Sequence, residues 1–301
     1  MTQLLQQLIN GLILGAVYAL FAEGFAVIFG TMGVLDLAHG AVLMIGAFVG
    51  YFLVTDYHIP VLVAFLLAMF VAGVASVAVE QATLRPLRNR GGEAGGFAVI
   101  VTTLGAAGVL ETWGQVTSHT QVLTYPQVSW LQHVIVIGPL YLSTLQFVVV
   151  GVTLVLGASL IFLLQKTQTG IRVRALAADH DGADLLGVNT TALYAAIFFV
   201  GGALAGATGV LVSLLFASVQ FQMGQPYLLI GVVVVTIGGL GSISGAIVAG
   251  LSVGIITSLV TGYFSSNLSE IIVFLLMIIF LIVRPSGLFG AYVRTRRATR
   301  A

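Results

Sequence analysis

Long apolar runs, separated by short polar stretches, make up most of the chain. A helix needs about 20 apolar residues to cross the hydrocarbon core of a bilayer. The runs that we predict to cross are 8–30, 41–55, 60–80, 97–115, 144–164, 192–214, 226–240, 246–262 and 268–284. The pattern predicts an all-α, polytopic transmembrane helix bundle with about eight to nine spans. Because the run 41–55 is short, we expect a tilted or broken helix there.

Composition supports a membrane protein. The 301 residues are 59% hydrophobic and 7% charged, and 37 of them are glycine, which is more frequent in membrane helices than in soluble ones. We treat 1–301 as a single membrane domain. The chain has no cysteine, which excludes disulfides, thiolate metal sites and a cysteine nucleophile.

The distribution of basic residues predicts the orientation. The 11 lysines and arginines fall in three segments, at 85–90, 166–174 and 284–300. Loops rich in Lys and Arg stay in the cytoplasm. Crossing the membrane about nine times then places the N-terminus outside and the C-terminus in the cytoplasm.

The segment 165–191 is a polar island between two apolar runs. Its charged residues are Lys166, Arg172, Arg174, Asp179, Asp181 and Asp184. Charge at this density does not enter the hydrocarbon region, so the island is a loop in water. We expect it to dock a cytosolic partner.

The longest segment on the opposite side is 116–143. Aromatic residues such as Trp113 and Tyr141 near its ends are typical of a membrane boundary. The alternating stretch from Trp130 to Tyr141 is compatible with a short hairpin, and the length of the loop is compatible with a docking surface for an extracytoplasmic partner.

An ionisable side chain, Glu23, lies within the first apolar run. A carboxyl near the middle of a span is unfavourable by about 3 kcal/mol on insertion scales. Helical spacing places Glu23 on a stripe of small residues that includes Gly15, Ala19 and Ala26, so it faces another helix or a cavity rather than lipid. Three roles are open: a substrate-pathway group, a structural hydrogen bond made by the protonated acid, and a contact for coupling or for another subunit.

Asp36 and His39 follow the first run and share one helical face. Three interpretations fit this spacing. Asp36 can cap a helix, both residues can line a transport pathway, or the two can form a metal pair that lacks its other ligands.

The run 192–214 carries Gly202, Gly206 and Gly209 on one side. Small residues let helix backbones approach closely in a membrane, where the hydrophobic effect does not drive association. The pattern predicts a tightly packed helix at this position.

Several catalytic and nucleotide-binding motifs are absent from the sequence. The single lysine, Lys166, follows Gln165 and belongs to no phosphate-binding Gly-x-x-x-x-Gly-Lys-Ser/Thr loop. The motif His-Glu-x-x-His does not occur either. We therefore expect no enzyme activity and no cofactor in this chain, and a partner or an ion gradient must supply energy for any active transport.

Four motifs together resemble one family. They are GVLDLAHG at 33–40, RALAADHDGADLLGVN at 174–189, GGLGSISGA at 238–246 and RPSGLFG at 284–290. In this order the chain resembles the permease subunits of branched-chain amino acid ABC importers, and specifically the H-type of the two paired permeases.

The resemblance implies a set of partners and a location. A second permease subunit, two cytosolic ATPase subunits and an extracytoplasmic substrate-binding protein would assemble with this chain in the bacterial cytoplasmic (inner) membrane. Membrane lipid is the remaining contact, and nucleic acid is not expected. The implied function is the import of branched-chain amino acids or a related small polar, amide or acid substrate.

The resemblance also implies that the polar island contacts the ATPase. A short helix over 175–186 would sit in a groove of that subunit, with Leu176, Leu185 and Leu186 as apolar contacts. The residues of the matching motif that we assign to coupling are Arg174, Ala177, Asp179, Ala183, Asp184, Leu185, Leu186 and Gly187. Gly187 is a natural helix stop.

The sequence departs from the family pattern at Glu23, Asp36 and Ala41, where an apolar residue, Asn and an acidic residue are usual. Glu23, Asp36 and His39 remain candidates for the substrate pathway. An alternative reading is a stand-alone, ion-coupled secondary transporter or channel that uses Glu23 and Asp36. A further one is a structural subunit of a membrane enzyme complex.

Overall fold

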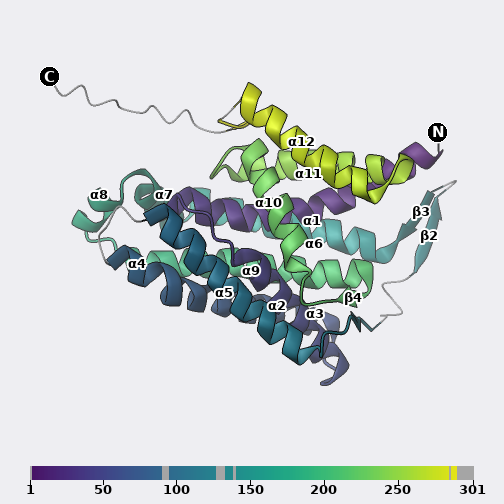
Figure 1. Ribbon diagram of the computed structural model, residues 1–301, viewed down its shortest axis with the longest axis horizontal. Coiled ribbons are helices and arrows are strands. Elements are labelled where there is room, and N and C mark those ends of the chain that lie inside the picture. Colours follow the sequence, from purple (N-terminus) through teal and green to yellow (C-terminus); the bar gives the residue numbers. More distant parts are fainter. Residues whose placement is uncertain (1, 90–94, 127–132, 138–139, 285, 290–301) are drawn as a thin grey trace.

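The computed structural model describes residues 2–89, 95–126, 133–137, 140–284 and 286–289 (Figure 1). The longer helices are α1 (Thr2–Met32), α2 (His39–Thr55), α3 (Val61–Val79), α5 (Gly95–Thr117), α6 (Thr144–Lys166), α9 (Thr190–Phe216), α10 (Gly224–Gly238), α11 (Ile243–Tyr263) and α12 (Ser266–Val283). The shorter elements are η1 (Glu80–Leu84), α4 (Arg85–Asn89), α7 (Gln168–Ala178), α8 (His180–Leu185), β1 (Leu123–Thr124), β2 (Val134–Ile137), β3 (Leu140–Ser143) and β4 (Ser218–Val219).

Each predicted apolar run corresponds to one of the longer helices. In the described part of the chain, 7 helices are long and apolar enough to cross a membrane. The other two, α2 and α10, are apolar but shorter. The predicted all-α membrane bundle is confirmed, and the second apolar run forms a short helix.

The helices pack around α1 and α9, which are largely buried, whereas α3, α5, α6 and α12 leave one side uncovered (Figure 1). The small-residue face predicted on α9 is confirmed. A Cβ atom on Gly202 would lie 2.9 Å from the carbonyl oxygen of Ala72 in α3, and one on Gly209 would lie 3.0 Å from the amide nitrogen of Ala47 in α2. Side chains at these glycines would push the helices apart.

One end of the bundle carries two small sheets and is called the hairpin end here. Strands β2 and β3 pair in antiparallel fashion, which confirms the predicted hairpin over its described residues, while Trp130 lies outside them. Strands β1 and β4 form the second antiparallel sheet. The side chain of Gln6 donates to the carbonyl of Tyr141 at 3.1 Å, so the start of α1 is tied to the hairpin.

The opposite end carries α7 and α8 and is called the α7–α8 end here (Figure 1). The prediction of one helix over 175–186 is wrong, because the segment folds as two helices with a break at Asp179. The backbone of Asp179 is extended (φ −157°, ψ 108°), and its carboxylate accepts a hydrogen bond from the backbone N–H of Gly182 at 3.1 Å. Aspartate is a strong N-cap residue, and here it begins a new helix.

Helix α2 begins inside the bundle rather than at its end. The ring of His39, the first residue of α2, lies 4.8 Å from the ring of Phe21 and 5.6 Å from that of Phe25. Helix α1 continues beyond Phe25 to Met32, a further rise of roughly 10 Å. Residues 33–38 therefore turn back into the bundle before α2 starts.

Helix α10 begins at nearly the same depth. A Cβ atom on Gly40 would lie 2.6 Å from the carbonyl oxygen of Gly224, the first residue of α10. The first turns of α2 and α10 therefore touch inside the bundle. Broken helices that meet in this way are a common feature of membrane transporters, where they lie next to the substrate.

Candidate functional site

The α7–α8 segment has one side that is buried against the bundle and one side that is exposed. Val173 and Leu176 of α7 and Ala183 of α8 are buried against the bundle. Leu185 and Leu186 at the end of α8 are 89% and 83% exposed. Two adjacent leucines exposed at the end of a helix indicate a surface that another molecule covers.

The buried position of Leu176 corrects one prediction. We expected its side chain to contact a partner, but it is 2% exposed and belongs to the main hydrophobic core. It lies three residues from Val173, so both residues occupy the inner face of α7. Leu176 holds the segment on the bundle, and the free apolar contact is left to Leu185 and Leu186.

Gly187 ends α8, as predicted. Its φ is +78°, its N–H donates to the carbonyl of Asp184 at 2.9 Å, and the N–H of Val188 donates to the carbonyl of Ala183 at 3.2 Å. This pair of hydrogen bonds forms a Schellman motif, which fixes where the helix stops. The position and direction of the exposed leucines are thereby set by the backbone.

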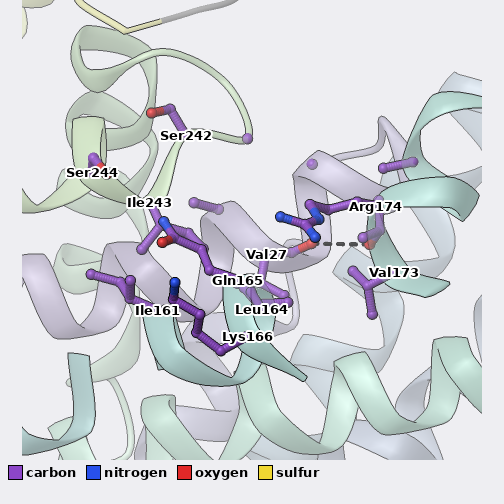
Figure 2. Close-up of a pocket in the computed structure, with 15 residues that line it drawn as sticks. Val27, Ile161, Leu164, Gln165, Lys166, Val173, Arg174, Ser242, Ile243 and Ser244 are labelled. Atoms are coloured by element: carbon purple, nitrogen blue, oxygen red, sulfur yellow. Dashed lines mark hydrogen bonds between the residues drawn. The ribbon is translucent and has the colours of Figure 1, made fainter. Parts of the chain in front are cut away.

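A cavity of about 450 Å³ separates α7 from the first residues of α11 (Figure 2). It is lined by Ala26, Val27, Gly30, Thr31, Ile161, Leu164, Gln165, Lys166, Val173, Arg174, Ala177, Gly241, Ser242, Ile243 and Ser244. Arg174 and Ala177, two of the predicted coupling residues, thus face this space between the segment and the bundle. A displacement of α7 relative to the bundle would change the shape of the cavity.

Glu23 is buried, 2% exposed, and faces α6. A Cβ atom on Gly157 would lie 2.9 Å from Oε1 of Glu23, and Oε2 has no hydrogen-bond partner among the described residues. The stripe of small residues on α1 therefore faces helices rather than lipid, as predicted.

Asp36 and His39 lie together on the other side of α1. Oδ1 of Asp36 accepts a hydrogen bond from the N–H of Ala38 at 3.0 Å, which makes a tight turn directly before α2. Oδ2 of Asp36 and both ring nitrogens of His39 are buried and have no partner among the described residues. The structure thus brings Asp36 and His39 together and leaves Glu23 apart from them.

Comparison with known proteins decides the family. A family model described as a branched-chain amino acid transport system / permease component matches residues 7–281. The chain belongs to this permease family. No solved structure matches it.

Several relatives cover nearly the whole permease. The high-affinity branched-chain amino acid transport system permease protein LivH of Escherichia coli strain K12 is 29% identical over 297 residues, which are 95% of each chain. LivH of Salmonella typhimurium is 28% identical over the same length and coverage. The corresponding protein BraD of Pseudomonas aeruginosa is 28% identical over 301 residues, again 95% of each chain.

A buried ion pair in the permease was missed by sequence reasoning. Arg88 of α4 donates to Glu80 of η1 at 3.1 Å, and the Arg88 guanidinium lies 4.3 Å from the centre of the Tyr194 ring in α9. Glu80 is fully buried. Tyr194 lies in the second turn of α9, so this contact links the start of α9 to the turn that follows α3. The two charged residues are eight positions apart and meet across a π-helical turn. In a regular α-helix only side chains three or four positions apart are in contact, so the sequence did not predict this pair.

A stability experiment tests the turn at Asp36 in the permease. We expect Asp36→Asn to leave the thermal unfolding midpoint unchanged, because the amide oxygen can accept the same hydrogen bond from Ala38. Asp36→Ala removes the acceptor and should destabilise the protein by about 1 kcal/mol. Both variants are measured in detergent beside the unaltered protein, and equal midpoints for Asn and Ala would show that the turn does not contribute.

Proposed function

We propose that this chain is the membrane-spanning permease subunit of an ATP-driven ABC importer, which translocates branched-chain amino acids delivered by an extracytoplasmic binding protein. The single observation that carries the coupling role is the pair of exposed leucines, Leu185 and Leu186, on an anchored segment at one end of the bundle. The relatives named as branched-chain amino acid permeases support the substrate class.

We further propose that the α7–α8 end is cytoplasmic. The described basic residues Arg85, Arg88, Lys166, Arg172 and Arg174 belong to elements at this end, and the remaining one, Arg284, is the C-cap residue of α12. The positive-inside rule then places the hairpin end outside, with the N-terminus, and gives nine crossings when α2 and α10 are counted. The location that follows is the bacterial cytoplasmic (inner) membrane.

The partners follow from the two ends. Two cytosolic ATPase subunits would bind α7–α8 segments, one on this chain and one on a second permease subunit. The extracytoplasmic binding protein would dock at the hairpin end, where segment 116–143 lies. Within the predicted segment, Asp179 begins α8 and Asp184 is exposed beside the leucines, which supports contacts of both carboxylates with basic groups of an ATPase.

Of the three pathway candidates, Asp36 and His39 fit a route through the bundle best. They lie where α2 meets α10, and their unpartnered polar atoms can bind a passing polar group. Glu23 points away from this junction, toward Gly157. The same separation weighs against an ion-coupled transporter that uses Glu23 and Asp36 in one site.

The test of this proposal is purification of the tagged chain from its native membranes in mild detergent, followed by mass spectrometry. We expect a second permease and an ATPase with a phosphate-binding loop to accompany it. A homo-oligomer without an ATPase would overturn the proposal. Uptake that is abolished by an uncoupler but persists without ATP would do the same.

The helix stop at Gly187 provides a second test. No atom lies within 4 Å of a Cβ placed on Gly187, so only the left-handed backbone resists substitution. Asparagine tolerates this conformation, whereas a β-branched residue is disfavoured by about 1–2 kcal/mol or more. We expect Gly187→Val to reduce leucine uptake severalfold and Gly187→Asn to remain close to wild type, at matched membrane levels. Equal uptake by the two variants would show that the Schellman motif is not needed for coupling.

A further inference from the structure

A second cavity, at the hairpin end, has a lining unlike that of a lipid-facing groove. It measures about 520 Å³ and lies between the middle of α1, the start of α10, the end of α11 and the start of α12. Glutamines at 220, 222 and 225 and hydroxyl groups of α11 and α12 form much of its wall. Lipid tails cannot satisfy such groups, so a polar molecule is the fitting occupant.

The cavity carries one formal charge. Glu270, in the second turn of α12, lines it, and no Lys, Arg or His does. Within the described chain Glu270 has no ion pair, since the one salt bridge found there joins Arg88 and Glu80. A carboxylate at the edge of a membrane domain is stabilised by a cationic partner. The lining therefore favours a ligand with a positively charged group.

The opposite side of the cavity suits a negative group. Gln220 lines this side near the start of α10, and its side-chain amide can donate a hydrogen bond to an anion. The positive end of a helix dipole attracts anions. Gln222 adds a side-chain amide here, and Gln225 is held in place by hydrogen bonds of 3.0 and 3.3 Å to Glu111 of α5.

The remaining wall is apolar and branched. Leu229, Ile230, Val273 and Phe274 line it, and such a surface suits an aliphatic side chain. At the floor, the rings of Tyr18 and Tyr227 meet edge to face at 5.9 Å. Near them, the hydroxyl of Thr257 is buried without a partner in the described chain.

We propose that this cavity binds the zwitterionic amino acid during transport: Glu270 receives the ammonium group, the side-chain amides of Gln220 and Gln222 receive the carboxylate, and the apolar wall receives the side chain. The inference rests on the proposed function and assigns the site at which this permease holds its substrate. Beyond the floor, Phe21 lies one helical turn from Tyr18 and packs on His39.

The absence of cysteine makes a direct test possible. Ser266→Cys and Thr261→Cys each place one thiol on the cavity wall. In the complex purified with its native partners, without binding protein, we expect leucine to protect both thiols from a methanethiosulfonate reagent. We expect 4-methylpentanoate, which has the same carbon chain but no ammonium group, to protect them poorly. Gln121→Cys, on the exposed segment between α5 and β1, is the control that leucine should not protect.

Glu270→Gln, added to the Ser266→Cys chain, tests the charge. A charge-assisted hydrogen bond is lost, so the leucine concentration for half-protection should rise about tenfold or more, while that for 4-methylpentanoate stays the same. Glu270→Asp keeps the carboxylate, so its half-protection concentration for leucine should be close to that of the chain with Glu270. A rise that is equal for both ligands, or none, would overturn the role of Glu270.

The outcomes separate this inference from the proposed function. If the wild-type complex takes up leucine but leucine protects neither thiol, the cavity is not the substrate site and the proposed function stands. If the complex contains no ATPase and takes up no leucine, the proposed function is wrong, and the inference, which rests on it, is overturned as well. If Glu270→Gln releases the second permease or the binding protein without changing protection, Glu270 is a subunit contact and the inference is overturned.

Discussion

Replacing Leu185 and Leu186 together by serine is expected to abolish co-purification of the ATPase and, with it, leucine uptake. The two side chains are 89% and 83% exposed, so the bundle does not depend on them. If a partner covers both, their removal takes away about 3 kcal/mol or more of binding free energy. This loss corresponds to at least about a hundredfold weaker binding.

A leucine-to-serine substitution elsewhere at the α7–α8 end of the bundle serves as the control. Leu240, between α10 and α11, is 51% exposed and lies outside the α7–α8 segment. Leu240→Ser should leave both ATPase co-purification and uptake unchanged. Membrane levels and thermal unfolding midpoints of all variants should equal those of the wild type. If the double serine variant still co-purifies with the ATPase, Leu185 and Leu186 are not the docking contact.

The overall fold was predictable from the sequence because apolar runs of sufficient length form membrane helices almost regardless of detail. The runs 41–55 and 226–240 were short in the sequence, and they became α2 and α10, which start inside the bundle. The sequence indicated how long these helices are but not how far inside the bundle they begin. That depth depends on the stacking of His39 on Phe21 and Phe25 and on the contact of Gly40 with Gly224, which are long-range contacts.

In the α7–α8 segment the sequence predicted a helix and its stop at Gly187, but not the internal structure. Glycine strongly favours the left-handed backbone that ends a helix, so the helix stop at Gly187 could be predicted from the sequence. The break at Asp179 follows from its local N-cap hydrogen bond, whereas the burial of Leu176 depends on how α7 packs against α1 and α6, which no local pattern specifies. Leu176 and Leu185 are equivalent in the sequence, and only the bundle distinguishes them.

The candidate pathway was the least predictable part. Glu23, Asp36 and His39 drew attention because they are polar residues near apolar runs, and the structure separates the first from the other two. Glu270 and the glutamines near the start of α10 were not singled out, because each lies at the edge of an apolar run, where polar residues are common. Only their convergence on one cavity distinguishes them.

Gly46→Val is expected to prevent stable folding of the bundle. A Cβ atom on Gly46 would lie 2.6 Å from the carbonyl oxygen of Gly206, on the neighbouring helix α9. The obstacle is backbone, which cannot rotate away as a side chain can, so α2 and α9 must separate. Overpacking a core commonly destabilises by about 1–3 kcal/mol, and a shift between two central helices should exceed that range.

The same substitution at Gly151 of α6 isolates the effect of the helix contact. No atom lies within 4 Å of a Cβ on Gly151, and valine is a better helix former than glycine. Gly151→Val should therefore reach wild-type levels in the membrane and unfold at the wild-type temperature, whereas Gly46→Val should be degraded or aggregate. Size-exclusion profiles and thermal unfolding in detergent measure both. Equal behaviour of the two variants would mean that α2 and α9 do not approach as closely as Gly46 and Gly206 require, and the depth at which α2 begins would then be wrong as well.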